Sequence, residues 1–166
     1  MYIRPACFAD FPALLALNEE SVHFLSPLSA ERLNHLHSQA ALHLVLEKEG
    51  QVLAFVLAFR EGVDYDSPNY VWFNGYYPSF LYIDRVVVAK HAQGLGTGSL
   101  LYREVFAHAR ATGVALITCE FDIDPPNPVS EQFHRRFGFQ EVGKQAVAGG
   151  KKWVSLQAVT VGAYDV

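Results

Sequence analysis

One segment of the sequence has residue types and spacing that suit the binding of a phosphate group. It is the stretch Gln93-Gly94-Leu95-Gly96-Thr97-Gly98, which lies between a predicted strand and a predicted helix. Successive glycines let backbone N–H groups point into one concavity, and the helix N-terminus behind them adds partial positive charge. The stretch therefore predicts a cradle for a phosphate or pyrophosphate. A tight turn that needs positive φ is the alternative explanation.

Two common phosphate-binding motifs do not fit this stretch. A Walker loop requires Gly-Lys followed by Ser or Thr, and the sequence has no such tripeptide. A dinucleotide fingerprint that began at Gly94 would need a glycine where Ser99 stands. It would also follow its strand directly, whereas the glycines here come after a gap that begins at Val88.

The elements that must position the cradle follow from the spacing of apolar residues and from turn-forming residues. The predicted helices cover residues 11–22, 30–40, 99–111 and 128–137. The predicted strands cover residues 2–4, 42–47, 52–59, 80–88, 116–121, 139–147 and 151–159. The order is that of a mixed α/β layered protein whose first half is mostly antiparallel.

The segment from Glu61 to Ser79 is interpreted as a long loop, because glycine and proline residues interrupt it. Its aromatic residues are Tyr65, Tyr70, Trp72, Phe73, Tyr76 and Tyr77. Long connections are uncommon in compact domains and are often functional. The rings could wall a binding site or cover an open end of the core, and the two roles are compatible.

The cradle and the strand before it resemble the GNAT N-acetyltransferase superfamily. The family pattern is Gln/Arg-x-x-Gly-x-Gly/Ala after a strand that ends in Val. This sequence matches it with Val88, Gln93, Gly96 and Gly98.

A second mark of the same family lies downstream. The pattern is Asn-x-x-Ala, three residues, Tyr, three residues, then Gly-Phe. The sequence has Asn127, Ser130, His134 and then Gly138-Phe139, so serine and histidine replace the usual alanine and tyrosine. The close match covers residues 80–142, and the order of elements agrees over nearly the whole chain.

The resemblance implies a fold and a cosubstrate. The fold would be α/β (α+β), with a mostly antiparallel central sheet of about seven strands and helices on both faces, in a single domain over residues 1–166. The cosubstrate would be acetyl-CoA, with its pyrophosphate held by backbone N–H groups of Gln93, Gly94, Leu95, Gly96, Thr97 and Gly98. The enzyme would transfer the acetyl group to an amine by direct attack on the thioester.

The resemblance also implies where the pantetheine arm lies. It would occupy the gap where strand 80–88 splays from strand 116–121, against the backbone of Val86, Val87 and Val88. The Val88 amide would polarise the thioester carbonyl. Asn127 and Ser130 would contact the cofactor near its pantetheine, although Asn127 could equally be a plain helix cap.

Catalysis needs a base for the amine and an acid for the departing sulfur. Asp84 stands where many family members carry a glutamate base, and strand alternation would place it on one face with Val86 and Val88. An ion pair with Arg85 is its alternative role. Glu120 is the second candidate base, and a pair with Arg60 or Arg136 is its alternative role.

His134 replaces the usual tyrosine acid. Val129, Phe133 and Phe137 form the expected buried stripe of the last helix, so His134 need not be part of the core. An imidazolium acid would be lost as the pH rises. Tyr102 or a loop tyrosine could supply the proton instead. A surface histidine paired with Glu131 or Asp122 is the structural alternative.

Three functions compete at this stage. The first is acetylation of a small-molecule amine, with Trp72, Tyr76 and Tyr82 lining the acceptor site and offering cation–π contacts. The second is a protein or peptide N-acetyltransferase, which an open groove would favour. The third is a non-catalytic acyl-CoA sensor, against which the presence of candidate bases and an acid argues.

The amino-acid composition indicates what type of protein this is and which partners it lacks. Of the 166 residues, 51% are hydrophobic, as in a folded globular protein. The 13 basic and 17 acidic residues argue against a nucleic-acid or membrane-surface partner. Cys7 and Cys119 support neither a disulfide framework nor a metal site, and no signal peptide is visible at the N-terminus. The sequence predicts a cytoplasmic protein, and family members often form homodimers through their C-terminal strands.

Overall fold

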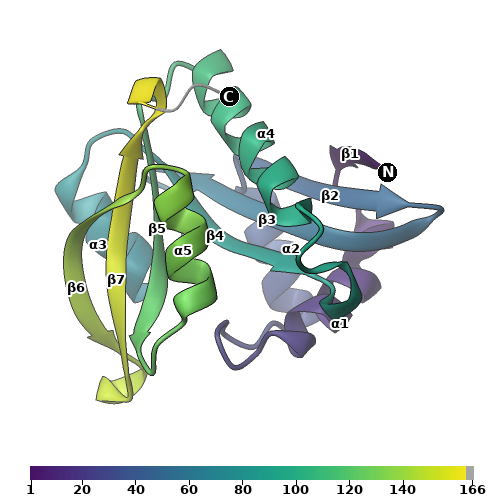
Figure 1. Cartoon of the computed structure of the whole chain (residues 1–166), viewed down its shortest axis with the longest axis horizontal. Helices are drawn as coiled ribbons and strands as arrows, with labels where there is room; N and C mark the ends of the chain where they lie inside the picture. Colours follow the sequence, from purple (N-terminus) through teal and green to yellow (C-terminus); the bar gives the residue numbers. More distant parts are fainter. Residues whose placement is uncertain (164–166) are drawn as a thin grey trace.

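The computed structural model describes residues 1–163, and its strands form one seven-stranded sheet in the order β1-β2-β3-β4-β5-β7-β6 (Figure 1). All neighbouring strands are antiparallel except β4 and β5, which are parallel. The strands are β1 (Tyr2–Pro5), β2 (Leu42–Lys48), β3 (Gln51–Arg60), β4 (Leu81–Val88), β5 (Leu116–Asp124), β6 (Gln140–Val147) and β7 (Lys152–Thr160). The predicted mostly antiparallel sheet is confirmed. The single domain expected over residues 1–166 stays a prediction, and its last three residues lie outside the described part of the chain.

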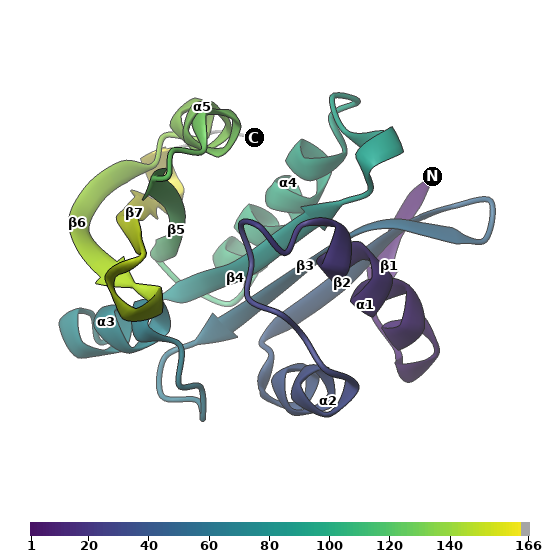
Figure 2. The same cartoon turned by 90° about the horizontal axis from the view of Figure 1, so that it is seen from below.

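Helices cover both faces of the sheet, as expected. Figure 2 shows α1 (Phe11–Glu20) and α2 (Ala30–Gln39) on one face, with α4 (Thr97–Ala111) and α5 (Pro128–Arg136) on the other. A further helix, α3 (Pro68–Tyr76), packs against β6 and β7 and lies behind them in Figure 1. Short 3₁₀ turns complete the described chain at Phe8–Asp10, Lys90–Ala92, Ala148–Gly150 and Val161–Ala163. Within residues 1–163, no helix combines the length and the apolar character needed to cross a membrane.

The pairing of β4 with β5 is short, and this shapes the site. The strands pair only where Leu81 lies opposite Ile117 and Tyr82 opposite Thr118. Beyond these pairs the two strands diverge, as Figure 1 shows. One edge of β4 therefore faces an open gap, with α4 and α5 on one side of it. The expected splay between these strands is confirmed.

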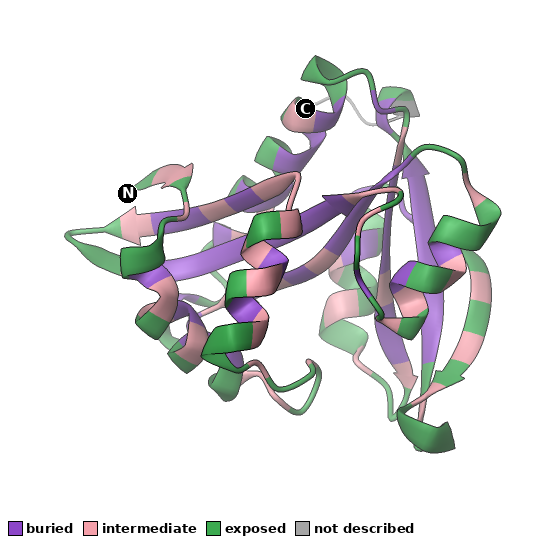
Figure 3. Cartoon of the chain, turned by 180° about the vertical axis from the view of Figure 1, so that it is seen from behind, coloured by how far each residue is buried: buried purple, intermediate pink, exposed green. Residues whose placement is uncertain are grey.

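Two packed clusters hold the sheet in place. The larger one joins the inner sides of α1 and α4 to strands β2–β5 and includes Leu14, Phe55 and Leu101. The second joins α3 to β3, β4 and β7 and includes Tyr70 and Phe73. Figure 3 shows that burial concentrates along the central strands, while the ends and the outer strand β6 are exposed. The aromatic residues of segment 61–79 therefore supply part of the core.

The interpretation of residues 61–79 as a continuous loop is wrong, because α3 lies inside it. Pro68 occupies the first turn, where a missing N–H has no cost. Tyr70 and Phe73 are three residues apart and form the buried side of the helix. That spacing was the feature of the sequence that indicated a helix here. Gly75 and the aromatic residues have poor helix propensity, and they argued against a helix.

The predicted packing face of α5 is confirmed at Phe133 and Phe137 and is wrong at Val129. Val129 is 78% exposed, whereas His134 is buried with only 4% exposed. The helix packs with the side that carries Phe133, His134 and Phe137, so the buried stripe is rotated away from Val129. Gly138, with φ +84°, ends the helix in the left-handed conformation that suits glycine.

Candidate active site

The free edge of β4 presents backbone groups to the gap. The N–H of Ala89 donates to the carbonyl of Leu53 on β3, with an N···O distance of 2.8 Å. Because successive N–H groups of a strand point to opposite sides, the N–H groups of Val86 and Val88 point away from β3. They face the gap that β5 leaves open. Val87, between them, points its N–H toward β3 and buries its side chain.

The glycine-rich stretch forms the turn that leads into α4. Gly94 (φ +76°) and Gly96 (φ +80°) both adopt the left-handed conformation, and Gly96 is the N-cap of α4. The side-chain amide of Gln93 donates to the carbonyl of Val88 at 3.2 Å, and the Thr97 hydroxyl donates to the carbonyl of Ala92 at 3.2 Å. These contacts fix the turn against the end of β4. The helix N-terminus with its free N–H groups fits a phosphate.

Gly98 permits a close approach of three elements. A Cβ atom at this position would lie 3.5 Å from the ring of Phe133 on α5 and 3.8 Å from a methyl group of Val88 on β4. Only a very small side chain fits there without displacing these groups. Leu95, by contrast, is 71% exposed at the tip of the turn, so its contribution to the cradle is its backbone. Both turn and helix start therefore suit the pyrophosphate of the expected cosubstrate.

A β-bulge places Asp84 differently from the simple alternation of a strand. Arg85 lies opposite Leu57 and Ile83 lies opposite Ala58, so Asp84 is the extra residue on β4. The expectation of an unbroken alternation through Asp84 is therefore wrong. The bulge brings the side chains of Asp84 and Arg85 together on the α1 face, with Oδ2 of Asp84 2.6 Å from Nε of Arg85.

Asp84 and Arg85 form a buried ion pair in which each side chain is 4% exposed. The other carboxylate oxygen of Asp84 accepts a hydrogen bond from the Tyr65 hydroxyl. Burial lowers the pKa of Arg85, but the negative charge of Asp84 and its hydrogen bond raise it more. The pKa of Arg85 therefore lies above its usual range. The alternative role named for Asp84, a pair with Arg85, is thus present in the structure. Both carboxylate oxygens already have donors.

Glu120 on β5 has different surroundings. The Tyr82 hydroxyl lies 2.8 and 3.0 Å from its two carboxylate oxygens and donates to them. Burial raises the pKa of Glu120 to about 8, the charge of Asp84 adds to the rise, and hydrogen bonds from Tyr82 and Asn69 oppose it. The alternative of a pair with Arg60 does not hold, because Arg60 pairs with Glu61. Glu120 has no cationic hydrogen-bond partner among the described residues.

His134 is held neutral inside an aromatic cluster. Its Nδ1 lies 2.7 Å from the carbonyl oxygen of Ser130, which can only accept, so Nδ1 carries the hydrogen. The Tyr102 hydroxyl then donates to Nε2 at 2.6 Å. Burial lowers the pKa of His134 to about 4, and the bond to Ser130 only partly offsets this. A pKa of about 4 moves the expected loss of an imidazolium acid to lower pH, and the role of His134 as the acid stays a prediction. The suggested surface pairs are wrong, because Glu131 pairs with Arg135 and Asp122 with Lys152.

The remaining cofactor residues lie at the start of α5. The side-chain oxygen of Asn127 accepts from the N–H of Ser130 at 3.3 Å, so Asn127 is the N-cap of α5. The Ser130 hydroxyl lies 3.2 Å from Nδ1 of His134. The structure thus shows the capping role of Asn127, and a contact with the cofactor stays a prediction.

The three expected acceptor residues do not lie together. Tyr82 is fully buried and contacts Glu120, as described above. Trp72 stacks on Tyr76 with ring centroids 4.0 Å apart, and its ring packs on β6 so closely that a Cβ at Gly143 would be 2.6 Å from it. Trp72 therefore joins α3 to β6, whereas Tyr76 is 68% exposed and stacks on Trp72; neither has a described contact with Asp84 or Glu120. Sequence reasoning missed Tyr65, whose hydroxyl reaches Asp84.

The connection between α1 and α2, residues 21–29, lies on the same face as these carboxylates and is called the strap below. Arg85 donates to the hydroxyl of Ser26 at 3.2 Å and to Oδ1 of Asn18 on α1 at 2.8 Å. Lys152 on β7 donates to the carbonyl of His23 at 2.7 Å. The strap thus contacts both sides of the gap, and in Figure 1 it reaches from α1 toward the lower end of β5.

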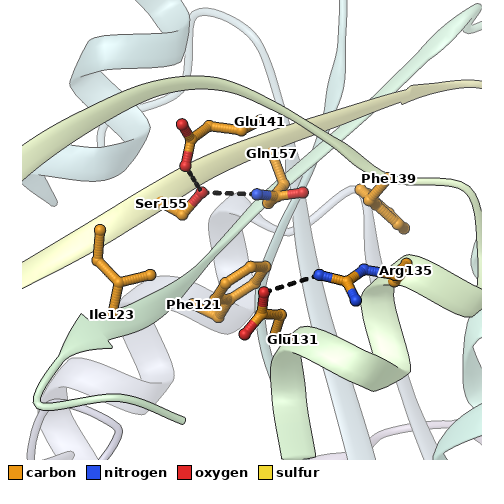
Figure 4. A pocket seen from close by; sticks show the side chains of 8 residues that line it. All are labelled: Phe121, Ile123, Glu131, Arg135, Phe139, Glu141, Ser155 and Gln157. Atoms are coloured by element: carbon orange, nitrogen blue, oxygen red, sulfur yellow. Dashed lines mark hydrogen bonds and ion pairs between the residues drawn. The ribbon is translucent and has the colours of Figure 1, made fainter. Parts of the chain in front are cut away.

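A separate hollow of about 290 Å³ lies between α5 and strands β5–β7 (Figure 4). Its apolar floor includes Phe121 and Phe139, whose other sides pack against His134. Its polar wall is a chain in which Gln157 donates to Ser155 and Ser155 donates to Glu141, each at 2.6 Å. None of the predicted site residues lines this hollow, so it is distinct from the cradle and from the carboxylates.

The candidate site thus combines a glycine-rich turn at the N-terminus of α4, an unpaired edge of β4 beside it and a buried carboxylate, Glu120, on β5. The Acetyltransferase (GNAT) family matches residues 11–139. The chain belongs to this family, and it is an acetyltransferase that uses acetyl-CoA. No curated protein matches the sequence.

Solved structures with the same fold support the family assignment. The ribosomal-protein-alanine N-acetyltransferase from Brucella melitensis is 23% identical with a TM-score of 0.71, and the match covers 96% of this chain and 99% of that one. The Salmonella typhimurium protein yncA, solved with its cofactor acetyl-CoA, is 18% identical with a TM-score of 0.74, covering 100% and 96%. The ribosomal-protein-S18-alanine N-acetyltransferase from Escherichia coli is 16% identical with a TM-score of 0.73, covering 96% and 93%.

Proposed function

We propose that this chain transfers the acetyl group of acetyl-CoA to a primary amine of a small molecule, with Glu120 as the general base. The observation that carries the proposal is the placement of the two halves of the site. The cradle leads into α4 on one side of the sheet, the free N–H groups of Val86 and Val88 face the gap, and Glu120 lies on the side of α3, where Asn69 reaches it. A donor and an acceptor could therefore meet in the gap from opposite faces.

Each group of residues has its own role in the proposed acetyl transfer. The backbone of residues 93–98 binds the pyrophosphate, and acetyl-CoA supplies the acetyl group when it is bound. The N–H of Val88 polarises the carbonyl of that group. Glu120 accepts a proton from the attacking amine, for which its pKa of about 8 is well matched to neutral pH. Asp84 and Arg85 position the surrounding elements.

Two features support a small acceptor. α3 packs over β7 and contacts β6, and the strap contacts both sides of the gap, so the acceptor face is covered. A protein or peptide N-acetyltransferase is the competing proposal, because two of the similar structures are ribosomal-protein-alanine N-acetyltransferases. Thiol release from acetyl-CoA, measured over a panel of amines and peptides, separates the two. A non-catalytic sensor would release no thiol with any of them.

Two expectations about the cell and the assembly belong to this proposal. Both cysteines are free thiols, which supports a reducing, cytoplasmic location. The outer side of β6 has no neighbouring strand in the described sheet, and it is where a homodimer would form. The mass of the protein in solution tests the dimer.

Binding of acetyl-CoA is tested at Gly96. Nothing lies within 4 Å of a Cβ at this position, but φ is +80°, so a valine there is strained by its backbone and distorts the turn. We expect Gly96→Val to weaken acetyl-CoA binding by about tenfold or more, because the N–H groups no longer converge. Calorimetry with acetyl-CoA measures this. An unchanged affinity in the folded variant would overturn the cradle assignment.

The proton source for the departing sulfur is tested at Tyr102. Its hydroxyl is the donor in the bond with His134, and its ring lies 4.7 Å from that of Phe133, which packs beside Gly98 of the cradle. We propose Tyr102 as the acid, and we expect Tyr102→Phe to lower kcat by about 10–100-fold, within the usual range for acid–base groups. A kcat that instead falls with a midpoint near pH 6.5, and only when His134 is present, would return the role to His134.

A further inference from the structure

Two side chains of the sheet bind the strap from opposite sides of the gap. The strap is also held near Ser26, where Asn18 donates to the Ser26 carbonyl at 3.1 Å and Leu25 and Leu28 pack against the core. On the β4 side, Arg85 donates to the hydroxyl of Ser26 at 3.2 Å and to its carbonyl at 3.4 Å. On the β7 side, Lys152 donates to the carbonyl of His23 at 2.7 Å. Lys152 is itself held by Asp122 of β5 at 3.2 Å. The chain between these points therefore crosses the face on which Asp84 and Glu120 lie.

The two fastenings differ in strength. The side chain of Arg85 is 4% exposed, and it also bonds to Asp84 and Asn18, so its release would leave a charge buried. The side chain of Lys152 is 27% exposed and makes a single bond to the strap. Water can replace that bond when it opens. The hydrogen bonds of Arg85 therefore keep the strap in place at Ser26, whereas the bond between Lys152 and His23 can break.

We propose that Lys152 is a latch that determines the size of the acceptor. With the latch closed, the strap restricts Glu120 to small primary amines. With the latch open, the residues around His23 swing away from β7, and an extended peptide can reach the same carboxylate. The latch is a specificity-determining residue and takes no part in proton transfer. This inference rests on the proposed function, because it concerns access to Glu120.

The chain offers a matched control for testing the latch. Lys152→Met keeps an unbranched side chain that is one atom shorter, and it removes the charge and the hydrogen-bond donor. The neighbouring Lys151 is exposed, and its side chain makes no described contact, so Lys151→Met removes the same charge without touching the strap. Both variants are compared with the parent protein for acetylation of a small primary amine and of a ten-residue peptide with a free amino terminus.

We expect Lys152→Met to raise kcat/KM for the peptide by about tenfold, as the loss of one charged hydrogen bond allows. The value for the small amine stays within about twofold, and Lys151→Met resembles the parent. An unchanged ratio of peptide to small-amine activity in Lys152→Met overturns the proposal. So does an equal change in both lysine variants.

Hydrogen exchange supplies a readout that does not depend on activity. Amides of the strap around His23 should exchange about tenfold faster in Lys152→Met, while those of α1 stay unchanged. Unchanged exchange in the strap overturns the latch. If the parent acetylates no amine at all, the proposed function fails instead, and the exchange rates still decide whether Lys152 holds the strap.

Discussion

Asp84 and Glu120 are carboxylates on the neighbouring strands β4 and β5, close enough for the charge of one to shift the pKa of the other. Their partners differ in charge. Asp84 is paired with the guanidinium of Arg85, whereas Glu120 accepts hydrogen bonds from a neutral phenol. Burial without a cationic hydrogen-bond partner raises the pKa of Glu120 to about 8. This difference in partners is the reason for proposing Glu120 as the base and Asp84 as a positioning residue.

Our proposal reverses the order in which the sequence ranked the two residues as candidate bases. Asp84 matches the family's strand position, which favoured it as the base. The structure shows both of its oxygens occupied, by Arg85 and by Tyr65. Glu120 has a pKa raised to about 8, so it exchanges a proton near neutral pH. The position of a residue in a motif therefore does not determine its role when a buried partner stands beside it.

The largest expected effect is on the rate of Glu120→Gln. Removal of a general base costs about 10²–10⁴ in turnover, and glutamine keeps the size and the bond to Tyr82. We expect kcat to fall by that amount while acetyl-CoA affinity is unchanged. With an acceptor whose amine is neutral throughout the range, kcat/KM of the parent should rise with pH up to about 8, and this rise should vanish in the variant. A large loss in Asp84→Asn with an active Glu120→Gln would restore the original ranking.

The cradle could be predicted from the sequence because its cause is local. Gly94 and Gly96 adopt positive φ, and the turn continues directly into α4. The spacing of the glycines therefore determines most of the backbone conformation of the turn. The succession of strands along the chain was predictable for the same reason, since most strands, such as β3 and β4, concentrate apolar residues. The two-residue hairpin at Glu49 and Gly50, both at positive φ, follows from its short join.

The surroundings of the catalytic groups could not be predicted, because they depend on other elements. The bulge at Asp84 exists only through pairing with β3. The burial of His134 depends on which side of α5 meets the ring of Tyr102, and two adjacent sides of that helix were plausible from the sequence. The contact of Lys152 with His23 joins residues 129 positions apart, and nothing local in the sequence indicates it.

Asp84→Asn and Glu120→Gln should change the free energy of unfolding in opposite directions, which tests the comparison between the two carboxylates. Asp84→Asn leaves the guanidinium of Arg85 buried without its anion, and breaking such a pair costs about 3–5 kcal/mol. We expect a decrease of that size in the free energy of unfolding at pH 7, measured by urea denaturation. A decrease below about 1 kcal/mol would show that Arg85 does not depend on Asp84, and the positioning role would fail.

Glu120→Gln should show the smaller and opposite change. The pKa of Glu120 rises from 4.5 to about 8 on folding. The folded state therefore binds the proton more tightly than the unfolded state does. Its favourable contribution is complete below pH 4.5 and is lost as the pH rises through about 8. Glutamine does not ionise, so the variant avoids this loss.

Each pKa unit corresponds to about 1.4 kcal/mol, and partial exposure of the residue reduces the total. We expect the free energy of unfolding of Glu120→Gln, relative to the parent, to be about 2 kcal/mol higher at pH 9 than at pH 4.5. Urea denaturation of both proteins across this range measures the difference, with Glu131→Gln on the exposed side of α5 as the control for a lost surface charge. A pH-independent difference would mean that Glu120 ionises normally, and it would remove the physical reason for choosing it over Asp84.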